Sequence, residues 1–399
     1  MDATNTTAAA MRGRWAVAAM FLVNGFLTGS WAPQIPVALT RLEITEFTLG
    51  LLILCFGLGA LSSMPWSGWL MSRRGTRSVL RFFAFLAPVG LLLVALAPNV
   101  WTAGAALYLF GAMAGSMDVA MNANAVVVEQ KLSRAIMSSS HAFWSIGGFV
   151  GGALGGLIIQ GFGHVVHAAI VMAVGLAIVT VASRHIVSEG KPAAHEQHAA
   201  FHFPRSPGVY LVGVLALFCM VPEGAVLDWA ALYMRQELGT SLATAGFAFA
   251  GFSGAMAIMR LAGDGIRNRF GAVTTLRASA LLAAAGMCVA SLSPWPWLAI
   301  AAFAVSGIGI ANTVPIAFSA GGNYPGMASG TGMAIVTTMG YSGILLAPSP
   351  IGFVAEHTGF GPIFIALSLL LVVVSLMASL ARPADFKTPP SGGLEPHPL

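Results

Sequence analysis

The chain has 399 residues, of which only 8% are charged and 57% are apolar. A soluble globular domain carries about 25% charged residues, so this composition excludes a water-soluble enzyme or binding module. The high apolar content also excludes a disordered chain, and the 47 glycines show no collagen period. We expect an integral membrane protein, for which a net charge of +5 gives no indication of nucleic-acid binding.

Apolar runs long enough to cross a membrane recur twelve times along the chain. A transmembrane helix needs about 20 mostly apolar residues, and these runs are apolar on all sides, which excludes the alternation of barrel strands. The expected fold class is therefore an all-α membrane protein with twelve transmembrane helices. The predicted spans are 14–38, 47–71, 79–97, 100–127, 136–160, 165–184, 208–233, 241–262, 273–292, 295–319, 328–354 and 360–381.

The basic residues predict the orientation of these spans. Of the 19 Lys and Arg residues, only Arg41 and Arg235 fall in loops on the outer side when the N-terminus is placed inside. Because positive residues are retained on the cytoplasmic side, both termini and the central linker are expected in the cytoplasm. The predicted location is the inner (plasma) membrane.

The two halves of the chain resemble each other at a constant shift of 196 residues. The matched pairs include Arg73 and Arg269, Gly75 and Gly271, Arg81 and Arg277, Pro98 and Pro294, and Trp101 and Trp297. Parallel repeats of this kind are typical of secondary transporters, with the solute site between the halves. The predicted organisation is a six-helix half at 1–184, a cytoplasmic linker at 185–206, a second half at 207–381 and a disordered tail at 382–399.

This plan resembles the major facilitator superfamily. The segment 68–77 is similar to its signature loop between the second and third spans, and 265–271 is similar to the second copy. The resemblance implies a gating role for Arg73, Gly75, Arg77, Arg269 and Gly271. The chain departs from the family pattern by having Ser72 and Asn268 where an aspartate is expected.

Two short motifs, 117–122 and 141–147, resemble the fucose-permease branch and a group of uncharacterised bacterial inner-membrane permeases. The segment 223–229 also resembles those permeases. The branch carries a proton-binding carboxylate at the position that matches Asp118.

Acidic residues inside the spans are the first candidates for function, because an ionisable group is costly in a membrane. Asp118 lies on a stripe of small and polar residues, and Glu223 lies between Pro222 and Gly224. We predict that Asp118 and Glu223 bind protons. The alternatives are a hydrogen bond between helices for Asp118 and a contact with backbone freed by a kink for Glu223.

Polar and aromatic side chains on helices that would line a central cavity are candidate solute contacts. They are Asn24, Trp31, Gln34, Asn122, His141, Trp144, Asp228, Trp229 and Tyr341. Aromatic rings beside amides suit a sugar-like solute, whereas tryptophan can also mark the membrane interface. For His141 the alternative is a buried structural histidine, and for Asp228 a charge at the outer mouth.

All Lys and Arg residues are predicted at span ends, loops or tails, so the buried acids are expected to lack a cationic partner. An unpaired buried acid tends to stay protonated until water reaches it, which favours proton coupling and disfavours an anionic solute. The leading hypothesis is a proton-coupled symporter of a small neutral polar solute, such as a sugar or a relative of one. The first alternative is proton-driven efflux of hydrophobic or cationic compounds, and a non-transporting receptor is another.

Several other properties follow from what the sequence contains. No phosphate-binding loop, nucleophile elbow or zinc signature is present, so we expect no enzyme activity and no cofactor. The linker histidines at 195, 198 and 202 are expected in a solvated tether without a metal. The expected partners are a small-molecule solute, protons and the lipid bilayer, with no nucleic acid, and the protein is expected to be a monomer.

Overall fold

The computed structural model describes residues 3–132, 136–188, 206–325 and 329–385, and this part of the chain is helical without strands. Eleven of its helices are long and apolar enough to cross a membrane. The all-α membrane fold with two helical repeats is confirmed.

The helices of the first half follow the predicted spans closely. The first span is α1 (Ala3–Trp31), continued by the short η1 (Ala32–Gln34) and by α2 (Ile35–Leu42). The next two spans form one continuous element, α3 (Glu46–Leu96), which is interrupted at Gly75 where the backbone leaves the helical region. The half is completed by α4 (Val100–Leu132), α5 (Met137–Phe162) and α6 (His164–Ser183).

The second half has the same order of spans, with two of them divided. It contains α7 (Pro207–Gln236), α8 (Leu242–Phe270), α9 (Ala272–Leu292), α10 (Pro296–Ile310), α11 (Thr313–Gly322), α12 (Ser329–Leu346), α13 (Pro348–Thr358), α14 (Gly361–Met377) and η2 (Ala378–Ala384). The segment predicted as one span at 328–354 divides into α12 and α13, and together they supply the twelfth crossing. Pro348 opens α13 and lacks the N–H that would continue the helix.

The backbone repeats the sequence symmetry in detail. Every described residue with a positive φ has a counterpart 196 positions away that also has a positive φ. The three pairs are Glu43 (52°) with Gly239 (61°), Gly75 (77°) with Gly271 (79°), and Gly163 (86°) with Gly359 (78°). Left-handed backbone is costly for residues other than glycine, so the shared conformation identifies equivalent turns in the two halves.

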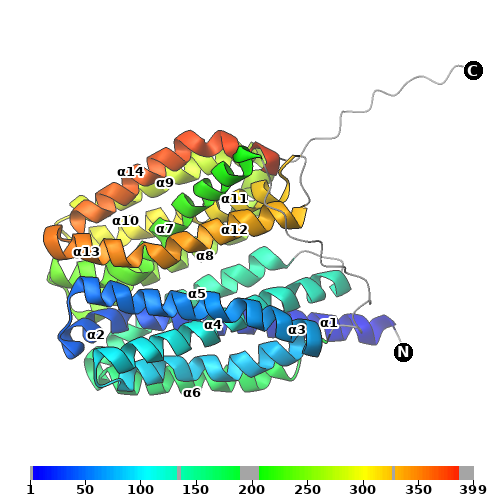
Figure 1. Ribbon diagram of the computed structural model, residues 1–399, viewed down its shortest axis with the longest axis horizontal. Helices are drawn as coiled ribbons and strands as arrows, with labels where there is room; N and C mark the ends of the chain where they lie inside the picture. The colour runs from blue at the N-terminus through cyan, green and yellow to red at the C-terminus, as the bar shows by residue number, and fades with distance from the viewer. Residues whose placement is uncertain (1–2, 133–135, 189–205, 326–328, 386–399) are drawn as a thin grey trace, which may run out of the picture.

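The two halves lie side by side, with α1–α6 in one group and α7–α14 in the other (Figure 1). The start of α1 and η2 lie at one end of the bundle, which we call the termini end, whereas α2 and α13 lie at the opposite, far end (Figure 1). Helix α5 packs against α8, and α13 packs against α3. These contacts join the halves along the core of the bundle and at its far end.

Glycines permit the close approach of α5 and α8. A Cβ atom added to Gly246 of α8 would lie 2.5 Å from the carbonyl oxygen of Gly152 in α5, and one added to Gly156 would lie 2.3 Å from that of Leu242. Two hydrogen bonds also join the halves at the far end: Gln236 of α7 donates to Glu46 of α3 at 2.7 Å, and the Ala243 N–H of α8 donates to Gln160 of α5 at 3.3 Å. The far end is therefore closed.

Part of the predicted linker and tail lies outside the described residues, namely 189–205 and 386–399, and this includes all three linker histidines. The first residues of the predicted tail, 382–385, are described. Arg382 lies in the last turn of η2, and the Asp385 carboxylate accepts a hydrogen bond from the backbone N–H of Ala272 at the start of α9.

Candidate solute site

An ion pair of the C-terminal half contacts the N-terminal half. The Arg260 guanidinium on α8 is 3.3 Å from the Glu223 carboxylate on α7, and their side chains are 13% and 20% exposed. Arg260 also donates a 2.7 Å hydrogen bond to the hydroxyl of Ser145 on α5 in the other half. The prediction that Glu223 lacks a cationic partner is therefore wrong, and so is the prediction that every Arg stays at a span end.

The direction of helical side chains explains this correction. Arg260 lies ten positions before Phe270, where α8 ends at the termini end. Side chains on a helix tilt toward its N-terminus, and α8 begins at the far end. The long Arg260 side chain therefore extends back toward the centre of the bundle, about one turn further in than its Cα position indicates.

Asp118, on α4 of the N-terminal half, shares one neighbour with this ion pair. Its carboxylate and Glu223 and Arg260 all lie within electrostatic range of the Tyr341 hydroxyl on α12. Within the described residues, the Asp118 carboxylate has no hydrogen bond or ion pair, and its backbone carbonyl accepts from Asn122 at 2.9 Å. Asp118 is thus the acid of the central cluster that has no ion-pair partner among the described residues, and we call it the spare acid.

His141 and Tyr341 complete the cluster. His141 on α5 lies within electrostatic range of Arg260 and packs edge-on against Phe21, with ring centroids 5.0 Å apart. Tyr341 remains 37% exposed although its helix is packed in the bundle, which indicates that it borders open space. Electrostatic interactions thus link four predicted site residues, namely Asp118, Glu223, His141 and Tyr341, and Asn122 lies one turn from Asp118 on α4.

Asn24 and Trp144 form hydrogen bonds between helices of the N-terminal half. Asn24 is 5% exposed and donates a 3.0 Å hydrogen bond to the carbonyl oxygen of Ala114 on α4. Its amide oxygen accepts a 2.9 Å hydrogen bond from the indole of Trp144 on α5. The amide therefore joins α1, α4 and α5, and its hydrogen bonds support a positioning role.

Gln34, Trp31 and Trp229 are packed away from the central cluster. Gln34 donates to the backbone carbonyl of His164 and contacts the ring of His167, both at 2.9 Å. Trp31 is 5% exposed, and Trp229 is fully buried against Phe360. These contacts explain the three residues as parts of helix packing, so we do not retain them as solute contacts.

Asp228 also lies apart from the cluster. It is 6% exposed and lines a small pocket between α7 and α13, together with Trp229. In this conformation it does not reach the outer mouth, because α13 covers it.

The predicted gating residues lie at the termini end in equivalent turns. Gly75 and Gly271 share a positive φ, and the Arg73 guanidinium lies 4.4 Å from the ring centroid of Trp69. Arg269 lies 5.4 Å from the ring centroid of Phe270, and Arg77 is partly buried on α3. Their gating role stays a prediction.

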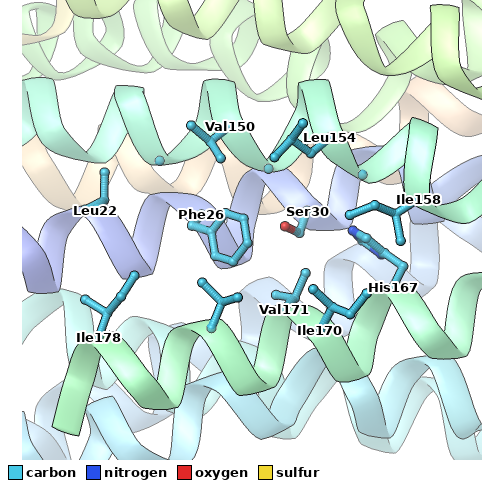
Figure 2. Close-up of a pocket in the computed structure, with 14 residues that line it drawn as sticks. Leu22, Phe26, Ser30, Val150, Leu154, Ile158, His167, Ile170, Val171 and Ile178 are labelled. Atoms are coloured by element: carbon cyan, nitrogen blue, oxygen red, sulfur yellow. The ribbon is translucent and has the colours of Figure 1, made fainter.

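A cavity in the N-terminal half is a different feature from the central cluster. It has a volume of about 190 Å³ and lies within the N-terminal half, between α1, α5 and α6 (Figure 2). Its lining is almost wholly apolar, with side chains such as Phe26, Leu154 and Val171 around Ser30 and His167 (Figure 2). Because it does not lie between the halves and carries few polar groups, it does not suit a polar solute.

Two residues of the cluster, Arg260 and Ser145, were not predicted as site residues. Arg260 lies inside the predicted span 241–262, and a basic residue within an apolar run is itself a functional signal. Ser145 is related to Tyr341 by the 196-residue shift, so the repeat places one polar residue from each half at the site. Both signals are present in the sequence.

The fold and the polar cluster between its halves define a multi-pass membrane transporter. The chain belongs to the Major Facilitator Superfamily, whose family model matches residues 17–222 and 213–397. It is 35% identical to an uncharacterized MFS-type transporter of Yersinia pestis, over 90% of this chain and 93% of that one. It is also 31% identical to the membrane protein MosC of Rhizobium meliloti, over 90% and 88% of the two chains.

Solved structures share the fold at low sequence identity. A mutant of the nucleoside transporter NupG superposes with a TM-score of 0.72 at 15% identity, covering 92% of this chain and 99% of that one. A D-xylose-proton symporter gives 0.70 at 13% identity, covering 92% and 97%. The fucose:proton symporter of E. coli gives 0.65 at 18% identity, covering 94% and 99%.

Proposed function

We propose that this protein is a proton-coupled symporter of a small, uncharged, hydroxyl-rich solute, such as a sugar or a relative of one, and that it works by alternating access. The observation that carries the proposal is the unpaired carboxylate of Asp118 on α4, which interacts electrostatically with the same Tyr341 hydroxyl as the Arg260–Glu223 ion pair of the C-terminal half. The site offers one acid for a proton and a donor–acceptor pair for the solute.

Charge balance supports the role of Asp118. Arg260 and Glu223 neutralise each other, so one negative charge remains in the cluster when Asp118 is ionised. A charge at this depth is costly, and a proton on Asp118 removes it without any change in the ion pair. A neutral solute then leaves the loaded carrier uncharged, which favours its rearrangement within the membrane.

The ion pair supports the choice of a hydroxylated solute. A hydroxyl group both donates and accepts hydrogen bonds, so it can accept from the Arg260 guanidinium and donate to the Glu223 carboxylate. Tyr341 and Trp144 offer aromatic surface for the apolar face of such a ring. The structurally similar symporters that carry xylose and fucose with protons agree with this class of solute.

The closed far end supports an arrangement in which the solute reaches the site from the termini end. The distribution of basic residues, with Arg41 and Arg235 alone near the far end, supports placing the termini end in the cytoplasm. We infer that the structure corresponds to a state of the inner membrane protein that opens to the cytoplasm.

The Arg260 guanidinium alters the expected charge selectivity. An anionic solute meets a cation at the site, so it is not excluded by two unpaired acids as the sequence alone predicts. Discrimination against anions then depends on the net negative charge of the cluster, in which two acids, Asp118 and Glu223, are set against one cation, Arg260. Replacing Glu223 by glutamine leaves Arg260 without its acid and is expected to improve anion binding by about tenfold, roughly 1.4 kcal/mol.

Reconstituted protein tests the proposal. Proteoliposomes would be screened with labelled D-xylose, L-fucose, uridine, D-glucuronate and tetraphenylphosphonium, first for exchange and then for accumulation driven by a pH gradient. We expect a neutral compound to be accumulated by the wild type. Asp118→Asn is expected to abolish accumulation while exchange persists, because the amide mimics one protonation state.

Glu356→Gln supplies the matched control, since this acid is exposed on α13 and its loss is expected to leave accumulation unchanged. Gradient-driven accumulation of the same solute by Asp118→Asn would contradict the proposal. Outward transport of tetraphenylphosphonium against its gradient would instead identify an efflux carrier.

A further inference from the structure

A second buried acid lies behind the far-end contact between the halves. Asp228 is 6% exposed on α7, and its pocket is otherwise apolar. The pocket is lined by Val221, Gly224, Ala225, Asp228, Trp229, Ile344, Ala347, Pro348 and Ile351. The pocket leaves no space for a water molecule, so the carboxyl group is not hydrated there.

No charged neighbour compensates Asp228 in the described part of the chain. The ionisable side chains that are described on the elements packed around α7 are occupied or exposed. Arg41 donates to the backbone carbonyls of Ala97 and Val94, Arg260 pairs with Glu223, and Arg267 donates to Ser319 and to the carbonyl of Ala384. Tyr341 belongs to the central cluster, and Arg269, Glu356, His357 and Arg382 are exposed. On α7 itself, Tyr233 donates to the carbonyl of Ala290 and Arg235 donates to the carbonyl of Thr240. Glu237, directly after α7, accepts from the N–H groups of Phe360 and Gly361. An ionised carboxylate without water or a partner is strongly disfavoured, so Asp228 is neutral in this conformation.

The element that covers Asp228 is also the element that closes the far end. Helix α13 lies between α7 and α3 at Gly352, where an added Cβ would be 2.3 Å from the Glu46 carbonyl oxygen and 3.1 Å from the Trp229 ring. Pro348 and Pro350 lack the N–H donors that would continue the hydrogen bonds of α12 into α13, and prolines at such a junction are a usual cause of a helix kink. Movement of α13 away from α3 would therefore also uncover Asp228.

We propose that Asp228 is a second proton-binding site, which links protonation to closure of the far end by α13. With α13 against α3, the dry pocket holds the carboxyl in its protonated form. When α13 moves and water enters, the carboxyl releases its proton, and the ionised form then opposes the return of α13. Acid conditions are thus expected to favour the closed far end, and alkaline conditions the open one.

Distance measurements between spin labels test this link without any transport assay. One label would replace Trp101, which is 85% exposed at the start of α4, and the other Thr358, which is exposed at the end of α13. The three free cysteines would first be replaced. For the otherwise unaltered protein, we expect the ratio of closed to open molecules to fall at least tenfold from about pH 5 to about pH 9. This fall corresponds to a difference of about tenfold between the proton affinity of the carboxyl in the closed conformation and that in the open one.

Asp228→Asn keeps the shape of the side chain and cannot ionise, so its ratio is expected to change less than about twofold over the same range. Glu356→Gln is the matched control on the same helix and is expected to respond like the parent protein. The closed-to-open ratio of Asp118→Asn is also expected to fall with rising pH as in the parent protein. This result would separate the inference from the proposed symport, which depends on Asp118. The inference is overturned if Asp228→Asn retains the parent response, or if the parent protein shows no response to pH.

Discussion

Removal of either partner of the Arg260–Glu223 ion pair tests the structure of the central site most sharply. The two groups are 3.3 Å apart and mostly buried, so their direct attraction is about 5 kcal/mol at an effective dielectric constant of about 20. Desolvation offsets much of this, and contacting pairs show net coupling energies of about 0.5–3 kcal/mol. We expect a coupling of about 2 kcal/mol, because the pair retains some exposure to solvent.

A double-mutant cycle measures this coupling. Arg260→Gln leaves a buried carboxylate without a partner and is expected to destabilise the protein by about 3 kcal/mol. Glu223→Gln leaves the guanidinium unpaired, and the double variant is expected to lose about 2 kcal/mol less than the sum of the single losses. The free energy of unfolding would be measured in mixed detergent micelles.

The control cycle combines Glu223→Gln with Arg81→Gln, because Arg81 is exposed on α3. Those two changes are expected to be additive. Additivity within about 0.5 kcal/mol for the Arg260 cycle as well would refute the ion pair, and with it the argument that the cluster carries one spare negative charge.

Three further substitutions test the packing around the site. Gly271→Ala is expected to cost about 1–2 kcal/mol of unfolding free energy, because its φ of 79° is unfavourable for alanine; Gly104→Ala, whose nearest neighbour would be 3.5 Å away, is expected to be neutral. Gly246→Ala places a methyl group 2.5 Å from a backbone oxygen of α5, so spin labels at the far end should report a larger open population. Gln34→Leu removes two hydrogen bonds and is expected to lower the melting temperature while solute affinity, measured by calorimetry, stays unchanged.

The helices and their pairing were predictable because the membrane imposes a simple rule on the sequence. A span must be apolar over about 20 residues, so segments such as 47–71 and 273–292 are visible directly and match the first part of α3 (Glu46–Met71) and α9 within a few residues. The repeat was visible because equivalent turns need the same residues, as at Gly75 and Gly271.

The partners of polar side chains were less predictable, because they depend on helix rotation and on side-chain direction. Arg260 reads as a residue near a span end, yet its side chain extends back to Glu223. Gln34 reads as a solute contact, yet α6 supplies its partners, His164 and His167. The apolar pattern does not encode which helix faces which, so it places a residue in a span without identifying its neighbour.

Solute-driven proton movement in proteoliposomes tests the central claim most directly. Vesicles loaded with a pH-sensitive dye and held without a pH gradient would receive the solute identified by the exchange screen on the outside. We expect the lumen to acidify as protons enter with the solute, and Asp118→Asn to show solute entry without acidification. Solute entry without any proton movement in the wild type would contradict proton-coupled symport.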